Sequence, residues 1–451
     1  MSAIPSPAGP RGSLLLGNLA EFGKHPLGFL ERCAREFGDF VPLRFLHRPV
    51  VLLNHPALIE AVLAGPHRQF RKTIGYRTPF MRRLFGQGLL TSDGDFWTRQ
   101  RRLAQPAFHR ERIAGYGGVI AQYTREMLSG WQTGAVRDVH DDVLKLTTRV
   151  VVKTLFNAEV PPSIRQLGEA SAVVLEQFTR QWSAWRLLWA WFPTAGTRRF
   201  EGVMRELDAF IFDLIREGRD TRQDHGDLLS MLLKVRDESG NGMSDRQLRD
   251  ELVTLMVAGL DTTALAVSWA LLLLAQHPES QRRLRVEIHR VVGGRTPGVA
   301  DLPQLPYTEA VLKESMRLYP PAWLVGREAV EDGEIGGHFI KRGTSLVMSQ
   351  WLMHRDARYH AEPAAFRPER WLEPACQHLP KFAFFPFGGG PRICIGNSFA
   401  MLEATIALVS ILQSWQINCE PDYTVEPWPS ITLQTRGGIW LKVERDGGVS
   451  P

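Results

Sequence analysis

A single long apolar stretch between Ser244 and His277 dominates the pattern of hydrophobic and polar positions along the chain. Residues 252–260 and 264–275 are almost entirely apolar, which predicts a helix that is buried on nearly all sides. The stretch opens with the capping-box pattern S-x-x-Q and ends before Pro278, which disfavours a helical residue in front of it. At 1.5 Å per residue the helix would be roughly 50 Å long, enough to cross a whole domain.

Polar residues interrupt this helix in its middle, at Asp261 and Thr262, directly after Ala258-Gly259-Leu260. A buried carboxylate is costly unless it is paired or functional, and glycine inside a helix costs about 1 kcal/mol relative to alanine. One interpretation is structural: the threonine bonds back to the preceding turn and the aspartate forms a salt bridge. The other is functional, because a local rule broken in the best-formed helix often marks a site.

The remaining pattern predicts a mostly helical chain with short strands. Helical periodicity is found in these ranges: 25–37, 57–64, 93 onward, 113–236, 278–292, 305–319 and 395–416. Alternation with β-branched residues predicts strands in these ranges: 40–54, 322–330, 334–350 and 423–443. Residues 66–92 mix basic, aromatic and glycine positions and are expected to form a long loop with little regular structure.

No internal repeat and no low-complexity linker divides the chain. We therefore expect one mainly α domain over residues 1–451. Its β-rich part is expected mainly at 38–66 and 322–350, and its helical part mainly at 93–320 and 394–416.

The composition, with 44% hydrophobic and 23% charged residues among 451, is that of a globular protein with a large core. The 54 cationic and 48 anionic side chains leave a net charge of +6, too small and too dispersed to indicate nucleic acid. The four cysteines form no C-x-x-C pair, which argues against zinc and redox motifs and fits a reducing compartment. No signal peptide and no apolar stretch of about 18 residues is found, so we expect a cytoplasmic protein without a transmembrane anchor.

A second unusual stretch, from Phe387 to Gly396, places a cysteine in a glycine-rich loop directly before a predicted helix. It reads F-x-x-G-x-R-x-C-x-G, with Arg392 two residues before Cys394. The ordinary interpretation of a lone cysteine is a buried small apolar residue. Here the glycines let backbone N–H groups approach the sulfur, and the helix start and the arginine favour a thiolate. Such a thiolate is what a haem iron requires of an axial cysteine.

This loop closely resembles the haem-binding loop of the cytochrome P-450 family. Four further motifs, all earlier in the chain, occur in the same order as in that family. They are W-x-x-x-R at Trp97 and Arg101, A-G-x-D-T-T at 258–263, E-x-x-R at Glu314 and Arg317, and F-x-P-E-R at 366–370. Trp371 follows the last motif where the family has Phe, which should change only packing. The motifs extend the resemblance over nearly the whole chain.

The resemblance implies a mainly α cytochrome P-450 fold, a large helical domain with a small β-rich subregion, and a haem b cofactor with Cys394 as its metal ligand. Asp261 and Thr262 would deliver protons as the catalytic pair. The cofactor-binding residues implied by the resemblance are Cys394, Trp97, Arg101, Arg327, Phe387, Arg392 and Gly396. A structural network would join Glu314, Arg317 and Arg370. The implied reaction is a monooxygenation that activates O2 and hydroxylates a lipophilic substrate.

The substrate is expected to be a fatty acid, terpenoid or steroid, because the residues placed near the cavity by their position are apolar. These residues are Phe80, Leu84, Phe85, Leu89, Ala258, Trp323, Leu324 and Leu433. Several of them are equally well explained as core. The tryptophan-rich segment 178–192 is interpreted either as core or as a lid over the cavity.

Nothing in the chain corresponds to a flavin or iron–sulfur domain, so we expect electrons from NAD(P)H through a separate ferredoxin or flavodoxin and a reductase. An acidic ferredoxin is expected to dock near Arg99, Arg102 and Arg110. Two alternatives stay open. One is a peroxide-driven relative, against which the intact pair of Asp261 and Thr262 argues. The other is a non-enzymatic haem sensor or carrier.

Overall fold

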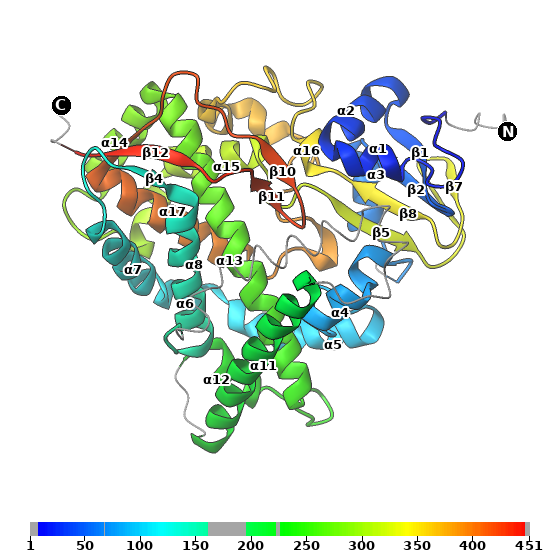
Figure 1. The fold of residues 1–451 in the computed structure, drawn as a ribbon, viewed down its shortest axis with the longest axis horizontal. Coiled ribbons are helices and arrows are strands. Elements are labelled where there is room, and N and C mark those ends of the chain that lie inside the picture. Colours follow the sequence, from blue (N-terminus) through cyan, green and yellow to red (C-terminus); the bar gives the residue numbers. More distant parts are fainter. Residues whose placement is uncertain (1–7, 67, 161–194, 222–225, 447–451) are drawn as a thin grey trace.

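A mostly helical part and a smaller group of strands make up the molecule, as Figure 1 shows. The computed structural model describes residues 8–66, 68–160, 195–221 and 226–446. The tryptophan-rich segment 178–192, interpreted above as core or lid, lies outside the described residues.

The helices have the following bounds: α1 (Leu19–Lys24), α2 (Pro26–Phe37), α3 (Pro56–Leu63), α4 (Pro79–Phe85), α5 (Gly94–Ala104), α6 (Arg110–Gly115), α7 (Gly117–Ser129), α8 (Val139–Phe156), α11 (Ala195–Thr221), α12 (Leu228–Lys234), α13 (Asp245–Gln276), α14 (Pro278–Val291), α15 (Pro306–Leu318), α16 (Gln350–Met353) and α17 (Asn397–Ser414). Short 3₁₀ helices are η1 (Ile74–Arg77), η2 (Gln105–Phe108), η3 (Val299–Gln304), η4 (Pro368–Leu372), η5 (Pro374–His378) and η6 (Gly390–Arg392).

The strands have the following bounds: β1 (Phe40–Phe45), β2 (Arg48–Leu53), β3 (Phe70–Lys72), β4 (Val136–Asp138), β5 (Val325–Ala329), β6 (Gly333–Ile335), β7 (His338–Ile340), β8 (Ser345–Met348), β9 (Trp415–Asn418), β10 (Pro427–Pro429), β11 (Leu433–Thr435) and β12 (Trp440–Arg445). The largest sheet has the order β1-β2-β8-β5-β3, in which only β2 and β8 are parallel. Smaller sheets are β4-β12-β9 and the hairpins β6-β7 and β10-β11.

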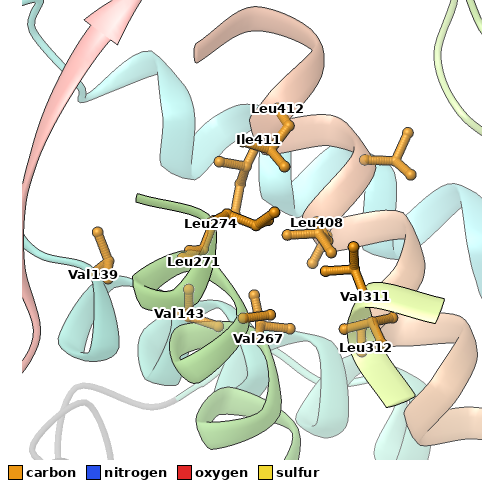
Figure 2. Packing of buried hydrophobic residues seen from close by; sticks show 14 of the residues in the cluster. Val139, Val143, Val267, Leu271, Leu274, Val311, Leu312, Leu408, Ile411 and Leu412 are labelled. Atoms are coloured by element: carbon orange, nitrogen blue, oxygen red, sulfur yellow. The ribbon is translucent and has the colours of Figure 1, made fainter. Parts of the chain in front are cut away.

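Helix α13 runs through the middle of the helical part and packs against α8, α11, α15 and α17 (Figure 1). Its C-terminal half belongs to the largest buried apolar cluster, in which Val267 and Leu271 meet Val143, Val311 and Leu408 from three other helices (Figure 2). Its N-terminal half belongs to a second cluster with α4, α5, α8, α11 and α12. The two clusters meet near the middle of α13, where the sequence places its polar residues.

The predicted capping box at the start of α13 is confirmed. The Gln247 N–H donates to the Ser244 hydroxyl at 3.3 Å, and the Ser244 N–H donates to the Gln247 side chain at 2.8 Å. By length and hydropathy, α13 is the one described helix that passes the test for a membrane span, but 72% of its most apolar window is buried inside the structure. We therefore assign it as a core helix.

The expectation of a loop over residues 66–92 is wrong. This segment contains β3, η1 and α4, with Pro79 in the first turn of α4 and the Thr78 side chain accepting from the Met81 N–H. Strand β3 exists because it pairs with β5, some 250 residues away in the chain. A three-residue strand of this kind has too little local pattern to be predicted.

Two other strand assignments also depend on distant partners. Strand β4 interrupts the stretch 113–236, which was expected to be helical, and it pairs with β12 near the C-terminus. The expected small sheet over 423–443 divides in two, because β10 and β11 pair with each other while β12 pairs with β9 and β4.

Candidate active site

The cysteine loop is held in a closed turn by its own backbone. The Cys394 N–H donates to the Phe387 carbonyl at 3.0 Å, and the Ile393 N–H donates to the Gly390 carbonyl at 3.0 Å. Gly390 has a φ of 66°, and a Cβ there would lie 1.8 Å from the carbonyl oxygen of Leu63 at the end of α3. Glycine is therefore required at position 390 by both backbone conformation and space.

The Cys394 side chain lies deep among protein atoms, but part of its own surface is accessible. It therefore borders an open space inside the protein. Burial raises the pKa of the Cys394 thiol, while the Gly396 N–H and the charge of Arg101 lower it, and burial outweighs them. The expected effect of the loop N–H groups and of an arginine on the thiol is therefore present, although the arginine is Arg101, and a bound metal cation would stabilise the thiolate further. A Cβ at Gly396 would lie 3.8 Å from Phe108, so no steric need for glycine is seen there.

Arg392 lies against Trp97, as the two motifs that contain these residues require. Its guanidinium carbon is 4.2 Å from the centre of the Trp97 ring, and it donates to Asp93 at 2.8 Å and to the Ser92 carbonyl at 3.1 Å. Its Nε has no partner among the described residues. Burial and the charge of Arg327 lower the pKa of Arg392 to about 10, although Asp93 opposes them.

Two further cations are buried beside this pair. Lys72 of β3 is directly paired with Arg327 of β5, and both side chains are buried. Burial lowers the pKa of Lys72 well below its usual value, and the charges of Arg327 and Arg392 lower it further. The Lys72 ammonium also lies 4.8 Å from the centre of the Tyr76 ring. Sequence reasoning missed Lys72 and Tyr76 because they belong to the segment that was expected to be a loop.

These residues leave buried positive charge without enough negative charge to balance it. Lys72, Arg327 and Arg392 surround one described carboxylate, that of Asp93. Unpaired buried cations are costly, and a ligand with two carboxylates would offset the cost. The two propionates of haem b match this requirement, with Cys394 available for the iron. The half-buried Arg101 lies close enough to Cys394 for their charges to interact.

The middle of α13 borders an open space. Ala258 is exposed, and Val257, Asp261 and Thr262 are partly exposed, although the helix is buried on both sides of this stretch. Accessible surface in the centre of an otherwise enclosed helix indicates a cavity beside it. Ala322, which follows the buried Pro321, is exposed in the same way and was not predicted.

Asp261 and Thr262 make different hydrogen bonds. The Thr262 hydroxyl donates to the Ala258 carbonyl at 2.7 Å, as the structural interpretation expected. Asp261 is in no ion pair with a described residue; instead its Oδ2 accepts from the Thr432 hydroxyl at 2.6 Å and from the Gln434 amide at 2.7 Å. The structural interpretation is therefore right for the threonine and wrong for the aspartate.

Gly259 has a packing role. A Cβ at this position would lie 3.1 Å from the Val151 side chain of α8, which is closer than most such contacts. The glycine therefore lets α8 approach α13.

The predicted network of Glu314, Arg317 and Arg370 is present and buried. Arg317 donates to the two Glu314 oxygens at 2.9 and 2.8 Å, and Arg370 donates to the same carboxylate at 3.0 Å. Burial by itself would raise the pKa of Glu314, but the hydrogen bonds and charge of Arg317 outweigh it and the pKa is lowered. The carboxylate is thus kept charged in the core.

The expectation that Trp371 changes only packing is wrong. Its indole N–H donates to Glu314 Oε2 at 2.9 Å. A phenylalanine side chain has no donor, so tryptophan adds a fourth side-chain hydrogen bond to those that Arg317 and Arg370 make with this carboxylate.

The predicted cavity residues divide into two groups. Ala258 is exposed, and Phe80 and Leu324 are half-buried. The other five pack inside apolar clusters and are Leu84, Phe85, Leu89, Trp323 and Leu433. Their packing leaves almost no surface for a substrate, so their assignment to the cavity wall is not supported.

Two buried histidines hold the segment that leads into the cysteine loop. His354 accepts from the Phe385 N–H at 2.9 Å, and its other ring nitrogen lies 3.3 Å from the Met316 carbonyl. His360 lies 3.3 Å from the Ala383 carbonyl. Burial lowers the pKa of both residues, to about 4 for His360 and well below the usual value for His354.

We expect these histidines to make the folded protein less stable in acid. The pKa of His360 is lower in the folded than in the unfolded protein, so neutral His360 contributes fully to the free energy of unfolding above about pH 6.5. This contribution, on the order of 3 kcal/mol in total, is lost as the pH falls towards 4. Urea unfolding of the haem-loaded protein at several pH values in this range measures how steeply the free energy of unfolding falls with pH. His360→Gln keeps an N–H donor but does not titrate, so its free energy of unfolding should depend less steeply on pH. An equally steep dependence would contradict a role for His360 in the acid sensitivity.

The chain belongs to the cytochrome P-450 family, because the family model of that description matches residues 7–441. It is therefore a haem-thiolate monooxygenase with the mainly α fold that was predicted. Cyclooctatin synthase from Streptomyces melanosporofaciens is 36% identical, and the match covers 94% of this chain and 92% of that protein. Cyclooctat-9-en-7-ol 5-monooxygenase from the same organism is 35% identical, with 91% of this chain and 89% of that protein covered. Pentalenene oxygenase from Streptomyces avermitilis is 34% identical, with 92% of this chain and 91% of that protein covered.

Proposed function

We propose that this enzyme hydroxylates a terpenoid, drawing electrons from NAD(P)H through a separate ferredoxin or flavodoxin and a reductase. The names of the three similar proteins support an oxygenation of this substrate class. Because they come from bacteria, we also propose that the enzyme works in the cytoplasm.

The observation that carries this proposal is the accessible stretch of α13. The apolar side chains of Ala258 and Val257 are accessible beside the polar pair Asp261 and Thr262 on the same stretch of α13. An apolar wall binds a hydrocarbon skeleton mainly by removing it from water. The polar pair then lies at the edge of the cavity, where protons are needed.

Each residue has a separate task in the proposed reaction. Cys394 would hold the haem iron, and the buried cations Lys72, Arg327 and Arg392 would hold its propionates. The bound haem supplies the oxidising chemistry that inserts one atom of O2 into a C–H bond. Asp261 takes up protons, and the Thr262 hydroxyl passes them on towards the oxygen site.

The relay role of Thr262 predicts uncoupling without loss of fold. Thr262→Ala removes only a hydroxyl that bonds to its own helix, so stability should change by less than about 1 kcal/mol. Product per NAD(P)H should fall on the order of tenfold, with the missing electrons recovered as hydrogen peroxide. Thr262→Ser, which keeps the hydroxyl, serves as the control, and full coupling in Thr262→Ala would exclude the relay.

The substrate class is tested by the change in haem spin state on binding. Cyclic terpene hydrocarbons and terpene alcohols should shift the spectrum at lower concentrations than fatty acids or steroids of similar size. Turnover of the best binder with a generic ferredoxin and reductase under labelled O2 should yield a product with one labelled oxygen. Preference for a fatty acid or steroid would exclude the terpenoid assignment and leave the monooxygenase class intact.

The expected docking arginines are less suitable than the sequence suggested. Arg99 donates to Asp237 at 2.7 Å, and Arg102 forms an ion pair with Glu238. The Arg110 side chain lies outside the described part of the structure. Since acidic residues already neutralise Arg99 and Arg102, we leave them out of the proposed docking surface for the electron donor.

A further inference from the structure

The hairpin β10-β11 lies beside α13 (Figure 1), and it carries the two side chains that hold Asp261. Thr432, directly before β11, donates its hydroxyl to Asp261 Oδ2 at 2.6 Å, and Gln434 within β11 donates its amide to the same oxygen at 2.7 Å. The Gln434 amide also donates to the Thr432 hydroxyl at 2.7 Å. The two donors therefore form a small closed network around one carboxylate oxygen.

The network is enclosed, so its hydrogen bonds do not compete freely with water. Thr432 is 8% exposed and Gln434 is 5% exposed. Both side chains point towards α13, since they donate to the same oxygen of Asp261. The apolar residue between them, Leu433, has no exposed surface.

The backbone of Leu433 ties the hairpin to two parts of the cavity wall. Its N–H donates to the Pro321 carbonyl at 2.9 Å, directly before the exposed Ala322. Its carbonyl accepts from the Trp269 indole on α13 at 3.2 Å. The strand that positions the acid is thus anchored to α13 and to the segment that borders the open space.

The chemistry of the contact distinguishes the two oxygens of Asp261. Both donors bind Oδ2, and no described donor is bound to Oδ1. No described Lys, Arg or His forms an ion pair with this carboxylate, and its neighbour Thr262 donates elsewhere. Two neutral donors on one oxygen fix the side-chain rotamer, which leaves Oδ1 as the oxygen open to a proton.

We propose that Thr432 and Gln434 are positioning residues for proton delivery: they fix Asp261 through Oδ2 so that Oδ1 serves the relay to Thr262. This inference rests on the relay of the proposed function. Because Leu433 between them is anchored to Pro321 and to Trp269 of α13, the hairpin keeps both donors in place beside the acid. Thr432 and Gln434 touch neither substrate nor cofactor in this role.

The direct test follows the Asp261 carboxylate by NMR. Protein labelled with carboxyl-13C aspartate is observed as the diamagnetic ferrous carbon monoxide complex, and the signal is assigned by its loss in Asp261→Asn. The double variant Thr432→Val with Gln434→Leu should move or broaden this signal, because both donors that fix the carboxylate are removed. Replacing Thr432→Val by Thr432→Ser should restore a hydroxyl donor and reverse part of the change.

The functional test measures product per NAD(P)H in the same proteins. The double variant should lose coupling on the order of tenfold, while binding of substrate, measured by the spin-state change, stays within about twofold. Thr435→Val is the matched control, since Thr435 follows Gln434 in β11 and is therefore on the opposite face of that strand, and the described hydrogen bonds to Asp261 come from Thr432 and Gln434. The carbon monoxide spectrum confirms that each variant has folded around its haem.

The outcomes separate the inference from the relay itself. If Asp261→Asn is uncoupled but the double variant keeps both its coupling and the Asp261 carboxyl signal of the wild type, the positioning role is overturned. If Asp261→Asn is fully coupled, the relay of the proposed function fails, and Thr432 and Gln434 then have no part in proton delivery. A changed Asp261 signal with lost coupling in the double variant, and not in Thr435→Val, supports the inference.

Discussion

Replacement of Cys394 by serine is expected to abolish the thiolate-type spectrum of the ferrous carbon monoxide complex. A serine oxygen does not supply the electron donation of a thiolate, on which O–O cleavage depends. Monooxygenase turnover should fall by at least about a thousandfold, equivalent to about 4 kcal/mol in the barrier. The structure adds a reason, since burial raises the pKa of this thiol and leaves the metal to hold the thiolate.

Cys376→Ser is the matched control for this prediction. Cys376 is a half-buried free cysteine in η5, outside the loop that carries Cys394, and the exchange of sulfur for oxygen is the same. It should leave spectrum and turnover unchanged. A thiolate-type spectrum that persists in Cys394→Ser would show that another cysteine binds the iron.

Arg317→Met is expected to have the largest effect on folding. Arg317 has no exposed surface, and besides two bonds to Glu314 it donates to the carbonyls of His354, Pro363 and Ala365. Its loss leaves these three carbonyls without that donor and weakens the balance of the buried carboxylate. Breaking a buried pair in this way costs about 3–5 kcal/mol, a large part of the 5–15 kcal/mol of a typical domain. Little haem-loaded protein should be recovered.

Trp371→Phe tests how much the indole hydrogen bond to Glu314 contributes to stability beyond the packing of the ring. It removes one hydrogen bond to Glu314 and leaves those of Arg317 and Arg370, so it should cost about 1–2 kcal/mol. Urea unfolding and the yield of the carbon monoxide complex compare the two variants. If Arg317→Met were as stable as the wild type, the network of Glu314, Arg317 and Arg370 would not contribute to the free energy of unfolding as expected.

Local pattern was sufficient for most of the longer helices, whereas the seven-residue α4 was missed. The predicted ranges 278–292 and 305–319 differ from α14 and α15 by one residue at most at either end, because proline at the start and the loss of periodicity at the end are local signals. Strands β3 and β4 were missed, because each has three residues and depends on a partner far away in the chain.

Residue types were sufficient to predict the network of Glu314, Arg317 and Arg370. Cys394, Trp97 and Arg392 were found from short motifs, and the structure brings the last two into contact. Lys72 was missed because it is unremarkable in the sequence and becomes important only when β3 places it beside Arg327. The sequence could not separate the five enclosed cavity candidates from core residues, since an apolar residue type is equally common in a core and at a cavity wall.

The sequence by itself determined which chemistry the protein can carry: one cysteine in a permissive loop, an acid and an alcohol in an apolar helix, and a mainly helical fold. These depend on residue type and on spacing within a few turns, which a linear chain records. Only the tertiary structure decided which side chains surround each of these groups. The partners of Asp261 come from Thr432 and Gln434, some 170 residues later, and the cations around Asp93 come from three separate segments. Burial, pKa and the choice of hydrogen-bond donors all depend on such distant neighbours, and no local pattern contains them.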